Sequence, residues 1–170
     1  MANDSHSVGF FAAEALARTS RRQPEKTALI AKDEKLTFSA LNQQVEALAG
    51  HLQREGVGQG DRVGVLLPNS MALPLSYYAT QKIGAVTVIL DVRLRGKELQ
   101  SVLADAALKL LIVHGQLLAE VQEILQMIHP LAVWVVNGDD DRSFEKRLAP
   151  TTARASSPTP SSWCSAAPSW

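Results

Sequence analysis

Three closely spaced glycines, Gly56, Gly58 and Gly60, are the first residues in this chain whose type and spacing could serve a ligand. Glycine-rich loops bind the phosphates of dinucleotides when the loop follows a buried strand and opens a helix. Here the order is reversed, because the glycines and Asp61 precede the apolar run at residues 63–67. We therefore interpret the three glycines as a turn between a helix and a strand, and we predict no nucleotide there.

Metal binding and nucleophilic catalysis have less support in the sequence. Asp139, Asp140 and Asp141 could ligate Mg²⁺, but we interpret them as a solvated polar turn. Cys164 has no neighbouring base that would activate its thiol. No two histidines have the spacing of metal ligands on a helix; they are His6, His51, His114 and His129. We therefore predict no metal ligand and no catalytic residue in this chain, and we interpret the histidines as structural or surface residues.

Length, charge and cysteine content narrow the class of protein. A chain of 170 residues is long enough for one domain with its own core. Its formal net charge of zero argues against nucleic acid as a partner, because phosphate backbones are bound by clustered lysines and arginines. The single cysteine excludes an internal disulfide and indicates a reducing compartment, and no apolar run is long enough to span a bilayer. We therefore expect a cytoplasmic protein.

The clearest helix pattern begins near Ser39, which can cap it, and ends at Gly56. Its apolar residues recur at helical spacing and predict one buried face. They are Leu41, Val45, Leu48 and Leu52. A further helix is expected between residues 70 and 83, where Pro74 is compatible only with the first turn.

Four short apolar runs predict buried strands. They lie at residues 63–67, 86–90, 110–113 and 131–136, and helix-like segments at 70–83, 97–107 and 117–128 separate them. This alternation predicts an α/β fold with a mostly parallel sheet and helices on both faces. Before it we expect a helix at 10–20 and a hairpin formed by residues 27–31 and 36–38.

Several short motifs occur in an order that resembles one enzyme family. Residues 56–63 read Gly-Val-Gly-Gln-Gly-Asp-Arg-Val, and residues 66–70 read Leu-Leu-Pro-Asn-Ser. Leu-Thr-Phe-Ser-Ala-Leu-Asn at 36–42 precedes them, and Gly-Ala-Val at 84–86 and Lys-Glu-Leu at 97–99 follow. Together they resemble the early segment of the adenylate-forming enzymes, the AMP-dependent acyl- and aryl-CoA synthetase superfamily.

The resemblance covers residues 10–136 and implies a partial N-terminal domain of an acyl-CoA synthetase-like fold. It implies an ATP- and Mg²⁺-dependent ligase that joins a carboxylate to coenzyme A through an acyl-adenylate. In that family a Ser/Thr/Gly loop followed by a lysine stabilises the leaving pyrophosphate, and the sequence contains no such motif. We therefore expect an N-terminal fragment, truncated before the phosphate-binding loop and inactive on its own.

A basic loop at residues 91–95 is the one place where the resemblance implies a cofactor contact. It reads Asp-Val-Arg-Leu-Arg where many family members have Asn-Pro-Arg-Leu, so that asparagine and proline are missing. In aryl-CoA ligases of this kind the arginine can approach the nucleotide phosphates of coenzyme A, which makes Arg93 the candidate cofactor-binding residue. The alternative interpretation is a solvated basic turn after a strand.

The composition changes after Val136 and sets the domain boundaries that we expect. Residues 1–148 would form the partial AMP-binding domain, and residues 149–170 a disordered Pro/Ser/Ala-rich tail, translated out of frame or derived from a vector. A second interpretation of the chain is a non-catalytic, doubly wound α/β domain that binds a ligand or partner. A fragment, unlike such a domain, would expose an apolar strand edge and self-associate.

Overall fold

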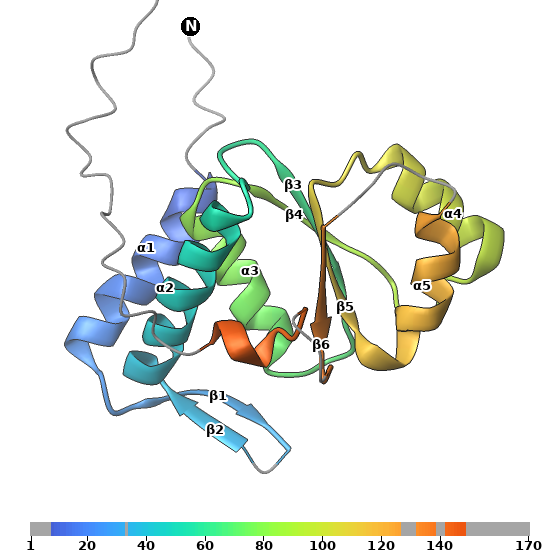
Figure 1. Ribbon diagram of the computed structural model, residues 1–170. Helices are drawn as coiled ribbons and strands as arrows, with labels where there is room; N and C mark the ends of the chain where they lie inside the picture. Colours follow the sequence, from blue (N-terminus) through green and yellow to red (C-terminus); the bar gives the residue numbers. More distant parts are fainter. Residues whose placement is uncertain (1–7, 33, 127–131, 139–141, 149–170) are drawn as a thin grey trace, which may run out of the picture.

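A parallel sheet lies between two layers of helices in the computed structural model (Figure 1). The structure describes residues 8–32, 34–126, 132–138 and 142–148. Within these residues, four strands form the parallel sheet and two further strands form an antiparallel hairpin beside it. This arrangement confirms the α/β fold with helices on both faces that the sequence predicted.

The strands of the sheet lie in the order β4-β3-β5-β6, and each neighbouring pair is parallel. Their bounds are β3 (Arg62–Leu66), β4 (Val86–Ile89), β5 (Leu110–His114) and β6 (Ala132–Val136). The helices that separate them in the chain are α3 (Ala72–Lys82), α4 (Gly96–Asp105) and α5 (Leu118–Leu125). Because β4 and β5 lie on opposite sides of β3, the chain reverses its direction across the sheet after β4.

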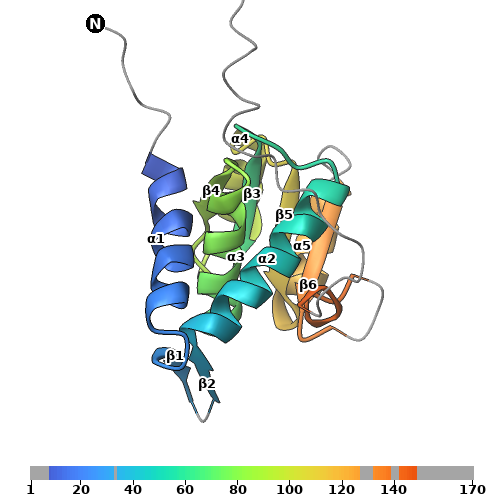
Figure 2. The same cartoon turned by 90° about the vertical axis from the view of Figure 1, so that its left-hand side faces the viewer.

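Alternating side chains of the strands divide the core into two layers, as a period of two requires. On one face, Val63 and Trp134 belong to a cluster with α3 and with two earlier helices, α1 (Val8–Arg22) and α2 (Phe38–Arg54). On the other face, Leu111 belongs to a cluster with α4 and α5. Figure 2 shows α1, α2 and α3 together in front of the sheet.

Helix α2 has the buried face that the sequence predicted, but a different N-cap. Its buried residues are Leu41, Val45, Leu48, Ala49 and Leu52. Thr37, and not Ser39, caps the helix: its side chain accepts a hydrogen bond from the backbone N of Ala40 at 3.2 Å. The helix already begins at Phe38, so Ser39 lies inside it. Gly56 follows the helix with a φ of +80°, which confirms its role as the terminator.

The hairpin and the proline follow the sequence predictions. Strand β1 (Thr27–Ala31) pairs antiparallel with β2 (Glu34–Thr37), which begins two residues before the predicted strand at 36–38. Pro74 lies in the first turn of α3, where the backbone N–H that it lacks has no helical partner. In the described part of the chain, no helix is both long and apolar enough to cross a bilayer.

Strand β4 lies at the edge of the sheet, which corrects the prediction of a buried strand. Val86 is 46% exposed and Ile89 is 61% exposed. Among the described residues only β3 pairs with β4. A short apolar run fits a central strand or an edge strand equally well, so the sequence alone could not separate the two.

After β6 the chain returns to the same strand, and Ser143 forms a parallel bridge with Val135. The backbone N of Val135 donates to the carbonyl oxygen of Arg142, and the backbone N of Phe144 donates to that of Val135, both at 2.8 Å. A single 3₁₀ turn, η2 (Glu145–Arg147), follows, where the sequence indicated one helical turn. The segment 149–170, predicted to be disordered, lies outside the described residues.

Candidate functional site at the carboxyl edge of the sheet

The topology of the sheet indicates that a ligand would bind at its carboxyl edge. In open parallel sheets, ligands bind where neighbouring strands send their following loops to opposite faces. Strand β3 leads to α3 on one face, whereas its neighbour β5 leads to α5 on the other. The loops that follow β3 and β5 therefore flank the position that this rule selects.

The loop after β3 contains a buried polar atom without a partner. The Oγ of Ser70 makes no hydrogen bond within the described residues. A buried hydroxyl without a partner costs roughly 1–3 kcal/mol. A hydrogen-bonding group brought to this loop would remove that cost, and Ser70 belongs to one of the motifs that carry the family resemblance.

His114 ends β5 at the same edge, and two neighbours hold its ring. Its Nδ1 accepts a hydrogen bond from the backbone N of Gln116 at 3.3 Å, and its Nε2 lies 3.0 Å from the side-chain amide of Asn137. The atom of Asn137 opposite Nε2 is Nδ2, and which of the two nitrogens donates depends on the tautomer of the ring. The pair links the end of β5 to the residue that follows β6.

The ends of β5 and β6 are closely packed. Asn137 takes a φ of +57°, and its backbone N donates to the Oε1 of Glu145 at 2.8 Å. The Oγ of Ser143 donates to the other carboxylate oxygen of Glu145, also at 2.8 Å. A Cβ on Gly115 would lie only 3.0 Å from the carbonyl oxygen of Asn137. These groups satisfy one another, so this corner supports the sheet more than it receives a ligand.

Arg93, the candidate cofactor-binding residue, lies in the loop after β4 and makes a fork with Asp91. Its Nε lies 3.0 Å from both carboxylate oxygens of Asp91, and its Nη2 lies 2.6 Å from Oδ2. The backbone N of Arg93 also donates to Oδ1 at 2.9 Å. The Arg93 side chain is 86% exposed. These hydrogen bonds lower the pKa of the Asp91 carboxyl to about 2 and raise the pKa of the Arg93 guanidinium.

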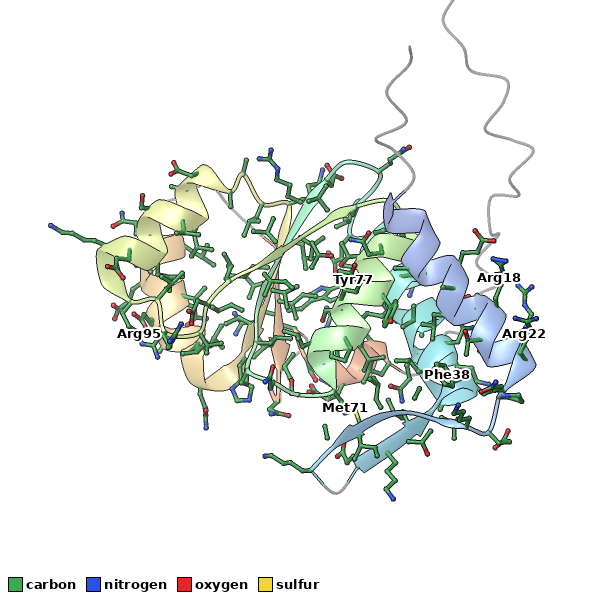
Figure 3. The ribbon with its side chains drawn as sticks, turned by 180° about the vertical axis from the view of Figure 1, so that it is seen from behind. Arg18, Arg22, Phe38, Met71, Tyr77 and Arg95 are labelled. Carbon is green, nitrogen blue, oxygen red and sulfur yellow. The ribbon has the colours of Figure 1, made fainter. Side chains whose placement is uncertain are left out.

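The second arginine of the loop, Arg95, fixes the loop to α5 (Figure 3). Its Nε lies 3.2 Å from the Oε2 of Glu120, and its Nη1 donates to the carbonyl oxygen of Leu94 at 2.7 Å. The other oxygen of Glu120 accepts a hydrogen bond from the backbone N of Gly96 at 3.1 Å, which caps α4. Arg95 thus links the loop to α5, whereas Arg93 pairs with Asp91 inside the loop and stays largely exposed.

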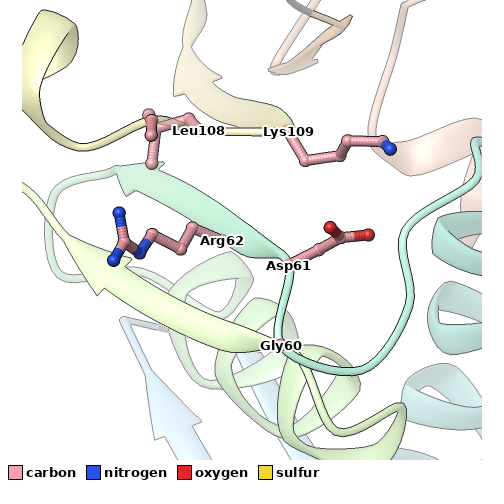
Figure 4. Close-up of a pocket in the computed structure, with 6 residues that line it drawn as sticks. Gly60, Asp61, Arg62, Leu108 and Lys109 are labelled. Atoms are coloured by element: carbon pink, nitrogen blue, oxygen red, sulfur yellow. The ribbon is translucent and has the colours of Figure 1, made fainter.

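The structure also contains a hollow of about 260 Å³, but at the opposite edge of the sheet (Figure 4). It is lined by Gly60, Asp61, Arg62, Ala107, Leu108 and Lys109. Two side chains at its rim form hydrogen bonds with backbone groups. Asp61 accepts from the backbone N of Gly58 at 2.9 Å, and Arg62 donates to the carbonyl oxygen of Ala106 at 3.2 Å. These contacts support the interpretation of the glycine segment as a structural turn.

The candidates for metal chemistry contribute no site in the described part of the chain. No three His, Cys, Asp or Glu side chains among the described residues lie close enough together to hold a metal ion. Several residues that the sequence analysis considered lie outside the described residues. They are His6, His129, Asp139, Asp140, Asp141 and Cys164.

Comparison with known proteins decides the family. A model of the family described as AMP-binding enzyme matches residues 16–167 of the chain. The chain belongs to the AMP-binding enzyme family. This finding confirms the resemblance that the motifs carried. The domain boundary at residue 148 stays a prediction, since the matched range runs past it.

Several relatives of this AMP-binding family member are CoA ligases. A 3-hydroxybenzoate–CoA/4-hydroxybenzoate–CoA ligase of Thauera aromatica is 34% identical over 116 residues, which are 68% of this chain and 22% of the relative. A 2-succinylbenzoate–CoA ligase of Bacillus anthracis is 37% identical over 83 residues, which are 49% of this chain and 17% of the relative. The chain therefore spans only a small part of the length of these relatives.

Solved CoA ligases share the fold of this AMP-binding family member. The anthranilate CoA ligase AuaEII, solved with anthranoyl-AMP, gives a TM-score of 0.76 at 28% identity and covers 85% of this chain and 28% of that one. A long-chain-fatty-acid–CoA ligase of Archaeoglobus fulgidus gives a TM-score of 0.75 at 26% identity and covers 80% and 29%. The chain thus has the fold of a partial N-terminal domain of an acyl-CoA ligase.

Proposed function

We propose that this chain is the N-terminal part of an ATP-dependent acyl- or aryl-CoA ligase. The observation that carries the proposal is the family match over residues 16–167. The likeness to solved aryl- and acyl-CoA ligases over most of the chain supports it. We attribute the complete reaction to a longer protein in which this chain supplies the first sheet and its helices.

The proposed reaction has two steps, with Mg²⁺ neutralising the charge of the phosphates. A carboxylate oxygen of the acid substrate attacks the α-phosphorus of ATP, and pyrophosphate leaves with the electron pair of the broken P–O bond. The sulfur of coenzyme A then attacks the acyl carbon of the adenylate, and AMP leaves as the thioester forms. The partners of this proposal are therefore a small carboxylic acid, ATP and coenzyme A.

The substrate class that we propose is a small aromatic carboxylic acid. The support is the names of relatives: a hydroxybenzoate ligase, a succinylbenzoate ligase and an anthranilate ligase. The likeness to a long-chain-fatty-acid ligase keeps a fatty acid as the competing substrate. The single cysteine and the use of ATP fit the cytoplasm, which we propose as the compartment.

We further propose that Arg93 binds a phosphate of coenzyme A. Guanidinium groups pair with phosphate in the same two-pronged geometry that they use with carboxylate. Arg93 already makes such a fork with Asp91 and remains 86% exposed, so its free edge is accessible to an anion. Its place after the carboxyl end of β4 is the end of a parallel strand at which ligands bind in such sheets.

The experiment that tests the function is ATP–pyrophosphate exchange with a panel of benzoates and fatty acids. We expect no exchange above the protein-free blank for this 170-residue chain, because it lacks the Ser/Thr/Gly loop and its lysine. A longer protein that contains this chain should exchange label with a benzoate. Turnover by the 170-residue chain itself would contradict the inactivity that we propose.

In that longer protein, Arg93→Ala should raise the KM for coenzyme A several-fold and leave the exchange reaction, which needs no coenzyme A, unchanged. The effect is modest because solvent and salt screen a contact made by an exposed side chain. Arg95→Ala is the variant with which Arg93→Ala is compared, because it removes the contact with Glu120 and leaves Arg93 in place. An unchanged KM in Arg93→Ala would remove the proposed role of this residue.

A further inference from the structure

Exposed apolar side chains gather on the side of the molecule where the sheet is open. Among the described residues, all the exposed large apolar side chains except Ile30 belong to the consecutive elements α3, β4 and α4. They are Tyr77, Val86, Ile89 and Val102. Figure 3 views the molecule from behind and shows β4 in front, with α3 and Tyr77 on one side of it and α4 on the other. We call this surface the β4 side.

The backbone of β4 has hydrogen-bonding groups that face away from β3. The backbone N of Val86 donates to the carbonyl oxygen of Asp61 at 2.7 Å. The backbone N of Leu90 donates to the carbonyl oxygen of Val65 at 2.9 Å. Successive residues of a strand direct their N–H and C=O groups to alternate sides. The N–H and C=O groups of Thr87 and Ile89 therefore face outward, where no strand of the described chain lies.

Nothing in the sequence of β4 protects this edge. Natural edge strands avoid pairing by means of lysines, prolines or bulges. Residues 83–90 read Ile-Gly-Ala-Val-Thr-Val-Ile-Leu and contain neither a charge nor a proline. The pairing of β4 with β3 continues without a bulge. Such an edge is typical of a strand that has a partner.

We propose that the partner is a second copy of this chain, whose β4 pairs antiparallel with the first. The outward groups of Thr87 and Ile89 lie symmetrically about Val88, so the edge is complementary to itself under a two-fold axis. Thr87 of each copy then lies opposite Ile89 of the other and exchanges both backbone hydrogen bonds with it. Val88 faces its own equivalent, and the two sheets join into one.

Charge and sequence favour this occupant over others. The chain has a formal net charge of zero, so two copies approach without long-range repulsion. The segment 149–170 suits the edge poorly, because proline cannot donate to a strand ladder. Its prolines are Pro150, Pro158, Pro160 and Pro168. This inference uses no step of the ligase reaction, and it agrees with the fragment interpretation, which predicts an exposed apolar strand edge and self-association.

The dimer is tested by sedimentation of the whole chain from about 1 to about 100 µM, where a moderate dimer exchanges with its monomer. We expect twice the monomer mass of 18.4 kDa at the upper end. Ile89→Lys should return the monomer mass, because it places a charge at the paired edge. Ile30→Lys is the matched control, since Ile30 is 65% exposed but lies on the hairpin, and it should leave the dimer intact.

The antiparallel register is tested by oxidation of a cysteine at position 88 in a Cys164→Ser background. Residues that face each other in a non-hydrogen-bonded antiparallel pair have Cα atoms about 4.5 Å apart, which a disulfide can span. Val88→Cys should therefore form a covalent dimer. Thr87→Cys should not, because the two copies of this residue lie two positions out of register.

Four results would overturn the proposal. A monomer at every concentration would remove the dimer, and a dimer that survives Ile89→Lys but not Ile30→Lys would move the interface to the hairpin. Oligomers larger than a dimer would contradict the two-fold pairing, which uses up the free edge of both copies. Failure of Val88→Cys to cross-link would overturn the antiparallel register.

Discussion

At the scale of single residues, the fork between Asp91 and Arg93 is the feature that sequence reasoning missed. The motif pointed to Arg93, but residues two apart in a strand share a face without touching, and in a helix they point apart. Only the turn after β4 brings the guanidinium onto the carboxylate. The same holds for the contact of His114 with Asn137, which depends on the pairing of β5 with β6.

The fork predicts an unusually acidic carboxyl. Hydrogen bonds from the side chain and backbone of Arg93 lower the pKa of Asp91 from 3.8 to about 2. Arg93→Ala removes the larger of these causes, so the pKa of Asp91 should rise towards 3.8. Carboxyl-detected NMR titration measures it. The wild-type fork stabilises the loop above pH 3.8, and that contribution is lost as the pH falls towards 2.

The control for this titration is Arg95→Ala, because Arg95 contacts Glu120 and not Asp91. It should leave the pKa of Asp91 near 2. An Asp91 that titrates near 3.8 in the wild type would show that the fork is not populated in solution.

At the scale of elements, the strands and helices of the described chain could be predicted because their apolar periodicity is strong. The buried face of α2 and the strand cores at β3 and β5 follow directly from it. The position of β4 at the edge could not, because strand order depends on which helices cover which face. The N-cap of α2 also differed by two residues, since Thr37 and Ser39 are both good caps.

Glycine substitutions test the packing of these elements. A Cβ on Gly64 in β3 would lie 2.5 Å from the Cδ1 of Leu108 and 2.9 Å from that of Leu111. Gly64→Ala should therefore lower the free energy of unfolding by about 1–3 kcal/mol through overpacking. Gly50→Ala, in helix α2, has only the Arg54 side chain at 4.0 Å and should raise it by up to about 1 kcal/mol.

Urea unfolding of the two variants at one pH measures both changes. Opposite signs for the same substitution would support the close approach of β3 to the segment before β5. A Gly64→Ala variant as stable as the wild type would contradict it.

At the scale of the whole molecule, Arg147 connects the end of the described chain to the layer of helices formed by α1, α2 and α3. Its guanidinium lies 4.6 Å from the ring centroid of Trp134 and 3.8 Å from Glu55, which follows α2. These residues are far apart in sequence, so no local pattern could predict the contacts. The contacts hold the turn at residues 145–147 against β6 and the end of α2.

The same junction makes stability depend on pH. Burial, and then the positive charges of Arg54 and Arg147, lower the pKa of His51 below 6.5. The unfolded chain therefore binds a proton more readily than the folded one. The contribution of His51 to the free energy of unfolding should be fully present above pH 6.5. It should be lost as the pH falls through 6.5 towards the pKa of the folded state.

The urea midpoint of unfolding, measured between pH 8 and pH 5, reports this dependence. In His51→Gln the midpoint should change less with pH. The variant keeps a polar side chain that does not titrate. An identical slope in wild type and variant would assign the pH dependence to other groups.

The cap that α5 provides for α4 restricts how the length of this chain can change. The Glu120 carboxylate accepts a hydrogen bond from the backbone N of Gly96, the first residue of α4, and the two residues are 24 positions apart in the chain. An insertion or deletion between the two residues would withdraw the carboxylate from Gly96 and Arg95 together. Natural variation in length should therefore be tolerated outside this interval and selected against within it.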